Sequence, residues 1–303
     1  MLTNKEIICP INLLNVAHKK KDIPAGIVNA GKILPMLSVV DAVKENLINP
    51  ILIGDKDEIQ KCAEELKFDI SKYKIIHEPD ENSTAKIAAK LAFEGKIKII
   101  VKGHIHTDVL MKEVIKKEYN LLGKTRLSHI WHMTLDKNDQ PIIITDGALN
   151  VSPNVKTKMH ILKNVINFCH RIGIEKPKVS VLSATEEVLD SVQSSIDAKE
   201  ITELAKKENL KADVFGPLAF DNSVSKKSSG IKGIKNSVAG QADVLLVPNV
   251  ETGNALVKMM IYFMGACAAG VVVGGKVPVV ITSRSDEATA RMASIAAAVV
   301  ALD

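Results

Sequence analysis

The sequence predicts an α/β protein in which short buried strands alternate with helices. Three observations support this fold class. Short apolar runs recur along the chain, and helical patterns of apolar residues lie between them. Hydrophobic residues make up 46% of the 303 residues but aromatic residues only 3%, so Ile, Val, Leu and Ala must fill the core. Strands that alternate with helices favour mainly parallel sheets joined by right-handed crossovers.

Eight apolar runs are expected to form strands. In chain order they are residues 25–28, 51–53, 97–102, 142–145, 179–182, 244–247, 271–273 and 277–281. The clearest helix spans residues 155–172, where apolar residues recur on one stripe. Asn154 can cap its start, and Gly173 suits the left-handed position after its end. The segment 183–186, Ser-Ala-Thr-Glu, has the pattern of a capping box and predicts the start of another helix.

The chain length suggests two domains, and the turn-rich stretch 146–154 is the best candidate boundary. Residues 259–275 carry no charge, but they contain four glycines and barely reach the length of a membrane span. We expect a buried helix, a turn and a buried strand there. The N-terminal residues lack the long apolar core of a signal peptide.

The charge balance and the aromatic content argue against a nucleic-acid-binding protein, and the cysteines indicate a reducing compartment. The net charge of +5 is mild, and the basic run at 18–21 is expected to be a solvated helix end. One Trp and three Tyr offer little surface for stacking bases, so we expect no nucleic-acid partner. The four cysteines are far apart and are expected to be reduced, mostly buried thiols of a cytoplasmic protein, although the pattern leaves a catalytic cysteine open. They are Cys9, Cys62, Cys169 and Cys267.

Small and polar residues follow several of the expected strands, where ligands of open α/β sheets bind. These segments are residues 102–107, 216–221, 248–254 and 282–286. In one of them, Gly253 allows a close approach of backbone, and a helix that begins near Asn254 would favour a phosphate. Lys258, one turn further on, could reach the same anion. A plain strand–turn–helix corner with a surface lysine explains the same pattern.

The segment 282–286 follows a strongly apolar strand and is expected to open the last helix near Ser285. Arg284 could hold a phosphate in a bidentate fork, and Ser283 could donate to an oxyanion. Asp286 or Glu287 could accept a proton. Helix capping by the serines, with first-turn acids at the helix dipole, is an alternative that is compatible with an anion site.

Two other types of site have weaker support. His104 and His106 follow a strand as in some metal-dependent hydrolases, and His129 and His132 could add ligands. However, no carboxylate stands at a clear ligand spacing, and Thr107 can cap a helix, so we expect no metal. The chain has no G-x-G-x-x-G sequence, which argues against a standard dinucleotide site.

Five segments in order resemble the phosphate acetyl/butyryltransferase family, and the butyryl branch most closely. They are residues 102–107 (KGHIHT), 145–150 (TDGALN), 216–221 (GPLAFD), 242–254 (ADVLLVPNVETGN) and 279–286 (VVITSRSD). The resemblance covers nearly the whole chain. It implies two α/β/α domains with a cleft between them, as in isocitrate-dehydrogenase-like proteins. Residues 1–145 and 282–303 would form the first domain, and residues 146–281 the second.

The resemblance also implies a function. A short acyl group would pass directly between coenzyme A and inorganic phosphate, in a homodimer that needs no metal or nicotinamide. Ser283 and Arg284 match the active-site Ser-Arg pair of the family. The spacing to the catalytic Asp of the acetyl branch is lost here, so Asp286 and Glu287 are both candidates for the base, and we choose Asp286. We expect coenzyme A or substrate to contact Lys102, Gly103, Thr107, Asn249, Gly253, Asn254 and Lys258.

Two alternatives stay open from the sequence. A nicotinamide-dependent decarboxylating dehydrogenase could share the fold, although the chain shows no obvious cluster of metal-binding acids. A non-catalytic acyl-CoA-binding protein could keep the same site without the chemistry. The acyl chain is not determined, because each methylene changes the free energy of burial by only ~0.8 kcal/mol.

Overall fold

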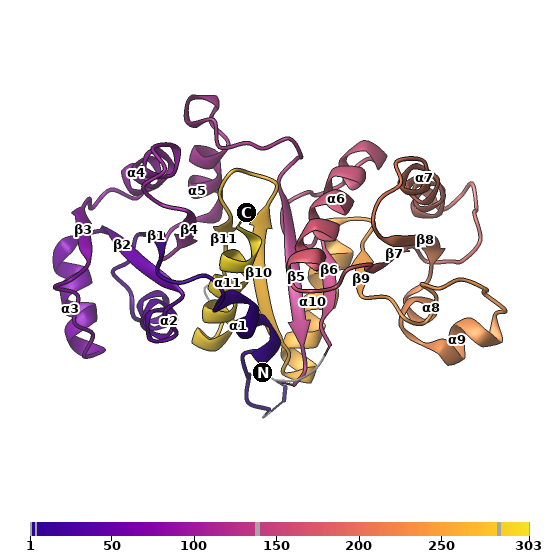
Figure 1. The fold of residues 1–303 in the computed structure, drawn as a ribbon, viewed down its shortest axis with the longest axis horizontal. Helices are drawn as coiled ribbons and strands as arrows, with labels where there is room; N and C mark the ends of the chain where they lie inside the picture. Colours follow the sequence, from indigo (N-terminus) through magenta and orange to yellow (C-terminus); the bar gives the residue numbers. More distant parts are fainter. Residues whose placement is uncertain (1, 4, 137–139, 284–285, 303) are drawn as a thin grey trace. The chain divides into compact units, whose positions relative to one another are not determined.

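A computed structural model describes residues 2–3, 5–136, 140–283 and 286–302 (Figure 1). The described residues form two compact units. Unit 1 comprises Met1–Lys5, Thr125–Leu135 and Asp139–Ala266, and unit 2 comprises Glu6–Lys124, Asp136–Asn138 and Cys267–Asp303. The units group residues 1–5, 125–135, 139–145 and 267–281 differently from the expected domains. The domain boundaries after residues 145 and 281 stay a prediction.

Unit 2 contains six strands, in the order β3-β2-β1-β4-β11-β10. Their pairings are parallel except that of β10 with β11, which is antiparallel. Ile, Val and Leu side chains dominate these strands and are mostly buried, as parallel strands covered on both faces require. The strands are β1 (Ile23–Val28), β2 (Ile48–Gly54), β3 (Lys74–His77), β4 (Ile99–Lys102), β10 (Cys267–Val273) and β11 (Val279–Val280).

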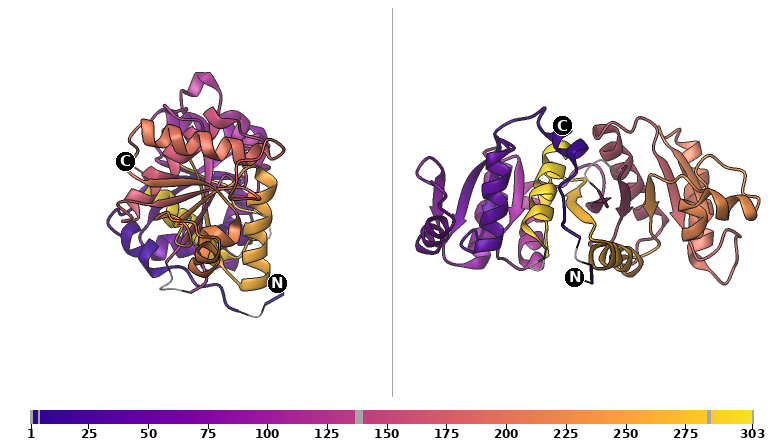
Figure 2. Two further views of the ribbon diagram at one scale, coloured as in Figure 1. Left: turned by 90° about the vertical axis from the view of Figure 1, so that its right-hand side faces the viewer. Right: turned by 90° about the horizontal axis from the view of Figure 1, so that it is seen from below.

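Helices cover both faces of the unit 2 strands (Figures 1 and 2). One group packs together as α1 (Ile11–Ala17), α2 (Ile33–Lys44) and α11 (Ala288–Ala301), and the other as α4 (Glu81–Phe93) and α5 (Thr107–Val114). Helix α3 (Lys56–Glu65) packs on β2 and β3, and a short 3-10 helix spans Lys117–Tyr119. Helix α11 is buried on every side from Ala290 to Val300, which its small alanine side chains permit.

The described residues of unit 1 form five strands, in the order β5-β6-β9-β7-β8, and among them only the pair β5–β6 is antiparallel. Helices α6 and α7 pack together beside these strands, whereas α10 packs on β6 and α8 on β7. The strands are β5 (Ser128–Thr134), β6 (Ile142–Thr145), β7 (Lys178–Leu182), β8 (Asp213–Leu218) and β9 (Val244–Leu246). The helices are α6 (Val155–Arg171), α7 (Gln193–Lys207), α8 (Phe220–Val224), α9 (Lys226–Ile231) and α10 (Val250–Met264).

The structure confirms the α/β class, and a strand lies in each of the eight expected runs. It also confirms the helix after Asn154, whose Oδ1 accepts from the amide of Thr157 at 2.9 Å, and Gly173 follows with φ 94°. Strands β3, β5 and β8 lie outside the eight expected runs. None of the three has a long apolar run, which explains why the pattern does not indicate them. Strand β5 has the sequence SHIWHMT, and all seven of its residues are buried.

Two local predictions are wrong. No helix starts at residues 183–186, because residues 183–192 form a loop and α7 begins at Gln193. The hydroxyls of this segment make other contacts instead of capping a helix. Thr185 Oγ1 accepts a hydrogen bond from the amide of Glu187, and Ser183 Oγ contacts Ser194 Oγ. The helix within 259–275 is not buried either, since the side chain of Phe263 at the end of α10 is 63% exposed. Among the described residues, no helix is long and apolar enough to cross a membrane.

Candidate functional site

The segment 282–286 follows β11 in unit 2, and several polar contacts hold it. The buried Lys102, at the end of β4, donates from Nζ to the carbonyl of Thr282 at 3.3 Å. The carboxylate of Asp286 accepts from the amide of Ser283 at 2.7 Å. Helix α11 begins at Ala288 rather than near Ser285, so Asp286 lies two residues before the helix. Arg284 and Ser285 lie outside the described residues.

Arg291 on α11 is a residue of this region that the sequence pattern did not indicate. Its side chain is buried, and its guanidinium donates to three atoms of the segment 282–286. The acceptors are Thr282 Oγ1 at 2.9 Å, the Ser283 carbonyl at 2.6 Å and the Asp286 carbonyl at 3.1 Å. Burial lowers the pKa of Arg291 from its ordinary value, and the Asp286 carboxylate opposes this shift. An arginine in a run of alanines and other apolar residues is the signal that could have found it.

The segment 102–107 passes from β4 into α5. Gly103 is buried against the end of β1, where a Cβ atom would lie 2.5 Å from the carbonyls of Val28 and Asn29. Its amide also donates to the Val28 carbonyl at 2.8 Å. This close approach is a structural reason for glycine at this position, independent of any ligand. Thr107 is the exposed first residue of α5, and His106, not Thr107, occupies the capping position.

The histidines do not form a metal site in the part of the chain that the structure describes. No group of three or more His, Cys, Asp or Glu side chains is placed there to hold a metal ion. His106 Nδ1 instead lies 3.0 Å from Glu81 Oε1, and the His104 carbonyl accepts from Asn29 Nδ2 at 2.6 Å. These contacts tie residues 104–106 to the neighbouring segments of unit 2.

In unit 1, Asn249 caps α10, which begins at Val250 and not near Asn254. The Asn249 side chain accepts from the amide and the hydroxyl of Thr252, at 2.9 and 2.7 Å. Because the helix starts earlier than expected, Gly253 lies within its first turn and Lys258 about two turns from its start. The amides of Val250, Thr252 and Gly253 already donate within the protein, so this helix end offers fewer amides to a phosphate than the sequence suggested.

The first turn of α10 packs against the loop that follows β6. A Cβ atom on Gly253 would lie 2.7 Å from the Cα of Gly147, so the two glycine backbones are in contact. Asn254 Nδ2 also donates to the Gly147 carbonyl at 3.4 Å. The carboxyl ends of β6 and β9 therefore bring together two of the segments that carry the family resemblance.

Asp146 holds the loop after β6 with a buried carboxylate. It accepts from the amides of His129, Ala148, Leu149 and Asn150, at 2.9–3.3 Å, and from the Asn150 side chain at 2.6 Å. Five N–H donors around one carboxylate satisfy its charge without a cation. The ring of His129 is buried nearby, and burial lowers its pKa to about 4 although Asp146 opposes the shift. His129 is therefore neutral near pH 7.

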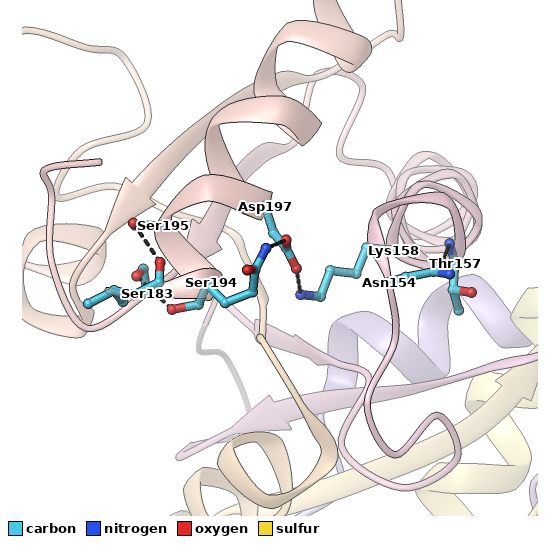
Figure 3. Close-up of polar contacts among 9 residues, drawn as sticks. Asn154, Thr157, Lys158, Ser183, Ser194, Ser195 and Asp197 are labelled. Atoms are coloured by element: carbon cyan, nitrogen blue, oxygen red, sulfur yellow. Dashed lines mark hydrogen bonds and ion pairs between the residues drawn. The ribbon is translucent and has the colours of Figure 1, made fainter. Parts of the chain in front are cut away.

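A second buried polar cluster joins α6 to α7 in unit 1 (Figure 3). Lys158 Nζ lies 2.7 Å from Asp197 Oδ2, and both side chains are largely buried. Gln193 Nε2 donates to the other oxygen of Asp197 at 2.8 Å. Beside this pair, Ser183 Oγ at the end of β7 lies 2.9 Å from Ser194 Oγ. The sequence pattern does not indicate this cluster, because Lys158 and Asp197 are far apart in the chain.

Cysteines show no sign of nucleophilic chemistry. Cys62, Cys169 and Cys267 are buried, Cys9 is half-buried, and all four are free thiols. Burial raises the pKa of Cys9 and of Cys169 to about 12, and it raises the pKa of Cys267 as well. A thiol with a raised pKa forms little thiolate at neutral pH and is a poor nucleophile.

The expected site residues thus fall into two groups. In unit 2, Lys102, Ser283 and Asp286 lie around the carboxyl ends of β4 and β11, with Gly103 and Thr107 following Lys102. In unit 1, Asn249, Gly253 and Asn254 lie at the start of α10, and Lys258 lies further along this helix, with Nζ 6.0 Å from the ring centre of Tyr262.

Comparisons with known proteins agree on one family. A family model described as phosphate acetyl/butaryl transferase matches residues 77–299. A phosphate acetyltransferase of Rickettsia prowazekii is 38% identical over 94% of this chain and 82% of its own length. A phosphate butyryltransferase of Clostridium acetobutylicum is 35% identical over 96% of this chain and 98% of its own length. The sequence is thus similar to both branches, and the expected preference for the butyryl branch is not supported.

One solved structure supports the same grouping. The crystal structure of a branched-chain phosphotransacylase from Enterococcus faecalis V583 is 31% identical in sequence. The structural match covers 92% of this chain and 98% of the phosphotransacylase chain, with a TM-score of 0.81. The α/β fold expected from the sequence is therefore the fold of a solved phosphotransacylase.

Proposed function

We propose, because this chain belongs to the phosphate acetyl/butyryl transferase family, that it passes a short acyl group between coenzyme A and phosphate by direct transfer. The observation that carries the proposal is the family match over residues 77–299, which includes the segment 282–286 after β11. In that segment, polar contacts fix Thr282, Ser283 and Asp286 on both sides of Arg284.

The proposed reaction needs no intermediate on the protein. The thiol of coenzyme A loses its proton, and the sulfur attacks the carbonyl carbon of an acyl phosphate. As the C–S bond forms, the bond between that carbon and the phosphate oxygen breaks, and phosphate leaves with the electron pair. In the reverse direction, phosphate attacks the thioester and the thiolate leaves. Holding both substrates in position could lower the barrier by ~7–11 kcal/mol.

Arg284 and Ser283 have the proposed roles of stabilising charge. Arg284 would hold the phosphate in a bidentate fork and neutralise the charge that develops on it as it leaves. The hydroxyl of Ser283 would donate to the oxyanion or to the thiolate. The contact between the Ser283 amide and Asp286, and the contact between its carbonyl and Arg291, support a fixed position for Ser283.

Asp286 is the proposed general base. A thiol with a pKa near that of free cysteine, about 8.5, is mostly protonated at neutral pH, so a base near it accelerates attack. Asp286 lies two residues before the start of α11, and its Oδ2 atom accepts from the Ser283 amide. Glu287 is exposed and makes no side-chain capping bond, which favours Asp286 over Glu287.

The remaining expected residues are proposed to bind coenzyme A or phosphate. Lys102 would add positive charge beside the segment 282–286, to which it already donates a hydrogen bond. Gly103 and Thr107 would bind through the start of α5. Asn249, Gly253, Asn254 and Lys258 would bind coenzyme A along α10, although the occupied amides at the start of this helix weaken its case as a phosphate site. We also propose that the protein is a homodimer located in the cytoplasm.

A thiol-release assay tests the proposed function. Acetyl-, propionyl-, butyryl- and isobutyryl-CoA are each incubated with the protein, with and without inorganic phosphate, and free thiol and loss of thioester absorbance are followed. We expect phosphate-dependent release from at least one of them. No turnover with any of the four would contradict the proposal, and binding of acyl-CoA without turnover would favour a non-catalytic binding protein.

A further inference from the structure

Arg291 makes an unusual set of contacts for a residue in an apolar helix. It lies on α11 among alanines, and only 4% of its surface is exposed. Its guanidinium donates from Nε, from one terminal nitrogen and from the other, each to a different residue. The three acceptors belong to Thr282, Ser283 and Asp286. A buried charge is retained only where such partners compensate for its lost hydration.

The acceptors stand on both sides of Arg284 in the chain. Thr282 and Ser283 precede it, and Asp286 follows it two residues later. One planar group therefore fixes both ends of the short segment that contains Arg284. Two further contacts act on the same segment, from Lys102 to the Thr282 carbonyl and from the Ser283 amide to the Asp286 carboxylate.

We propose that Arg291 is a positioning residue for acyl transfer, which fixes Thr282, Ser283 and Asp286 so that Ser283 meets the reacting atoms. Arg291 does not itself touch the substrate in this proposal, which rests on the proposed function of Ser283 and Arg284. Its fork has rigid geometry, with donors at both terminal nitrogens and at Nε, and so it can hold three acceptors at once. Lysine would keep the charge at this position but would replace the rigid fork by a single flexible ammonium.

Positioning of this kind affects rate more than binding. A displacement of a catalytic group by about 1 Å can reduce the rate by ~10²-fold even when the mutated residue is far from the chemistry. Substrate groups that contact other parts of the protein keep their binding energy. A variant of Arg291 should thus lower kcat strongly and change KM for acyl-CoA much less.

The test compares Arg291→Lys and Arg291→Gln with Ser294→Ala on the same helix. Ser294 is also buried on α11, but its hydroxyl accepts from the Gly270 amide at 2.9 Å and donates to the Ala290 carbonyl at 2.8 Å, both outside the segment 282–286. Ser294→Ala should therefore destabilise the protein and leave kcat unchanged. Urea unfolding of all three variants separates loss of stability from loss of rate.

We expect Arg291→Gln to lose about 10²-fold in kcat, with KM changed far less, and Arg291→Lys to recover only part of the rate. A third substitution at this position, Arg291→Ala, leaves space for an added guanidinium ion. Added guanidinium should restore part of the kcat of Arg291→Ala and should not raise the kcat of Ser294→Ala. If Arg291→Gln keeps wild-type kcat, the inference is wrong. It is also wrong if guanidinium restores nothing and Ser294→Ala loses kcat in proportion to its loss of stability, as the Arg291 variants do.

Arg284→Lys in the same experiment separates this inference from the proposed function. If Arg284→Lys loses activity while Arg291→Gln does not, the positioning role of Arg291 fails and the proposed site stands. If Arg284→Lys keeps normal kinetics, the proposed site itself is wrong, and an effect of Arg291→Gln would then have another cause and would also contradict the inference.

Discussion

Two segments that follow strands, residues 282–286 in unit 2 and residues 146–150 in unit 1, are held by buried charges of opposite sign. In the first, the guanidinium of Arg291 donates to two carbonyls and a hydroxyl. In the second, the carboxylate of Asp146 accepts from four amides and one side-chain amide. In both segments, backbone groups and a polar side chain form the hydrogen bonds that stabilise the buried charge.

The difference between these segments lies in where the holding residue comes from. Asp146 is part of the loop that it holds, so the loop is fixed by a local sequence pattern. Arg291 comes from a helix that follows its segment, and a second cation, Lys102, comes from β4. A segment held from several elements depends on the packing of α11 and β4. We expect the segment 282–286 to serve the reaction and the segment 146–150 to serve the fold.

Among the variants that test this comparison, Asp286→Asn is expected to lower kcat the most. If Asp286 is the general base, its loss should lower kcat by ~10²–10⁴-fold and remove the acidic limb of the pH–rate profile. Glu287→Gln is the matched control and should keep near-normal kcat. A loss in Glu287→Gln instead would move the base by one residue. Normal rates in both variants would mean that the Asp286 carboxylate only holds the Ser283 amide, as Asp146 holds the amides of its loop.

The next effect in size is expected from Arg284→Lys. The charge is kept but the bidentate fork is lost, so kcat/KM should fall by about 10²–10³-fold while circular dichroism shows an unchanged fold. Lys207→Arg, at an exposed position of α7 outside the proposed site, is a useful control because it also exchanges two cations and should change the rate far less. Near-normal kinetics of Arg284→Lys would remove Arg284 from the site.

Asp146→Asn should change stability more than rate. The new amide group would face N–H donors that now have a carboxylate acceptor, and losing hydrogen bonds to a charged group costs about 1.5–3 kcal/mol. Urea unfolding measures this loss, with the exposed Asp221→Asn of the same unit as control. If Asp146→Asn unfolds like the wild type but loses kcat, the loop 146–150 serves the reaction, and the comparison with 282–286 is wrong.

The smallest effect concerns the buried histidines of β5. Burial lowers the pKa of His129 and of His132 to about 4, below the value near 6.5 of an unfolded chain. The unfolded state therefore binds more protons between these values, and stability falls as the pH drops from about 6.5 toward 4. Each histidine should cost about 1 kcal/mol between pH 7 and pH 5.5. Urea midpoints at these pH values measure the change.

The variant His132→Gln should reduce this dependence on pH. An unchanged pH dependence in His132→Gln would show that this histidine titrates normally in the folded protein.

Much of the fold follows from the sequence, because apolar runs of Ile, Val and Leu mark buried strands directly. Strand β5 is the instructive failure. It is buried along its whole length although it contains two histidines, a serine and a threonine, so its burial comes from its neighbours and not from its own composition. The capping-box pattern at residues 183–186 failed because serine and threonine hydroxyls bond equally well in turns.

The candidate site shows the same limit. Residues at or near the carboxyl ends of strands, such as Lys102 and Ser283, could be predicted, since ligands bind at the carboxyl ends of parallel strands. Arg291 could not be predicted in this way, because its role depends on the path of α11 past the segment 282–286. The start of α10 was also misplaced by four residues, since the capping role of Asn249 became clear only from its contacts with Thr252.

An initial-velocity experiment with both substrates varied distinguishes direct transfer from a covalent route. Rates of thioester formation are measured over a grid of acyl phosphate and coenzyme A concentrations. Direct transfer requires both substrates on the protein together and predicts double-reciprocal lines that intersect. Parallel lines would indicate that the acyl group first bonds to the protein, as in ping-pong kinetics, and would contradict the roles proposed for Ser283, Arg284 and Asp286.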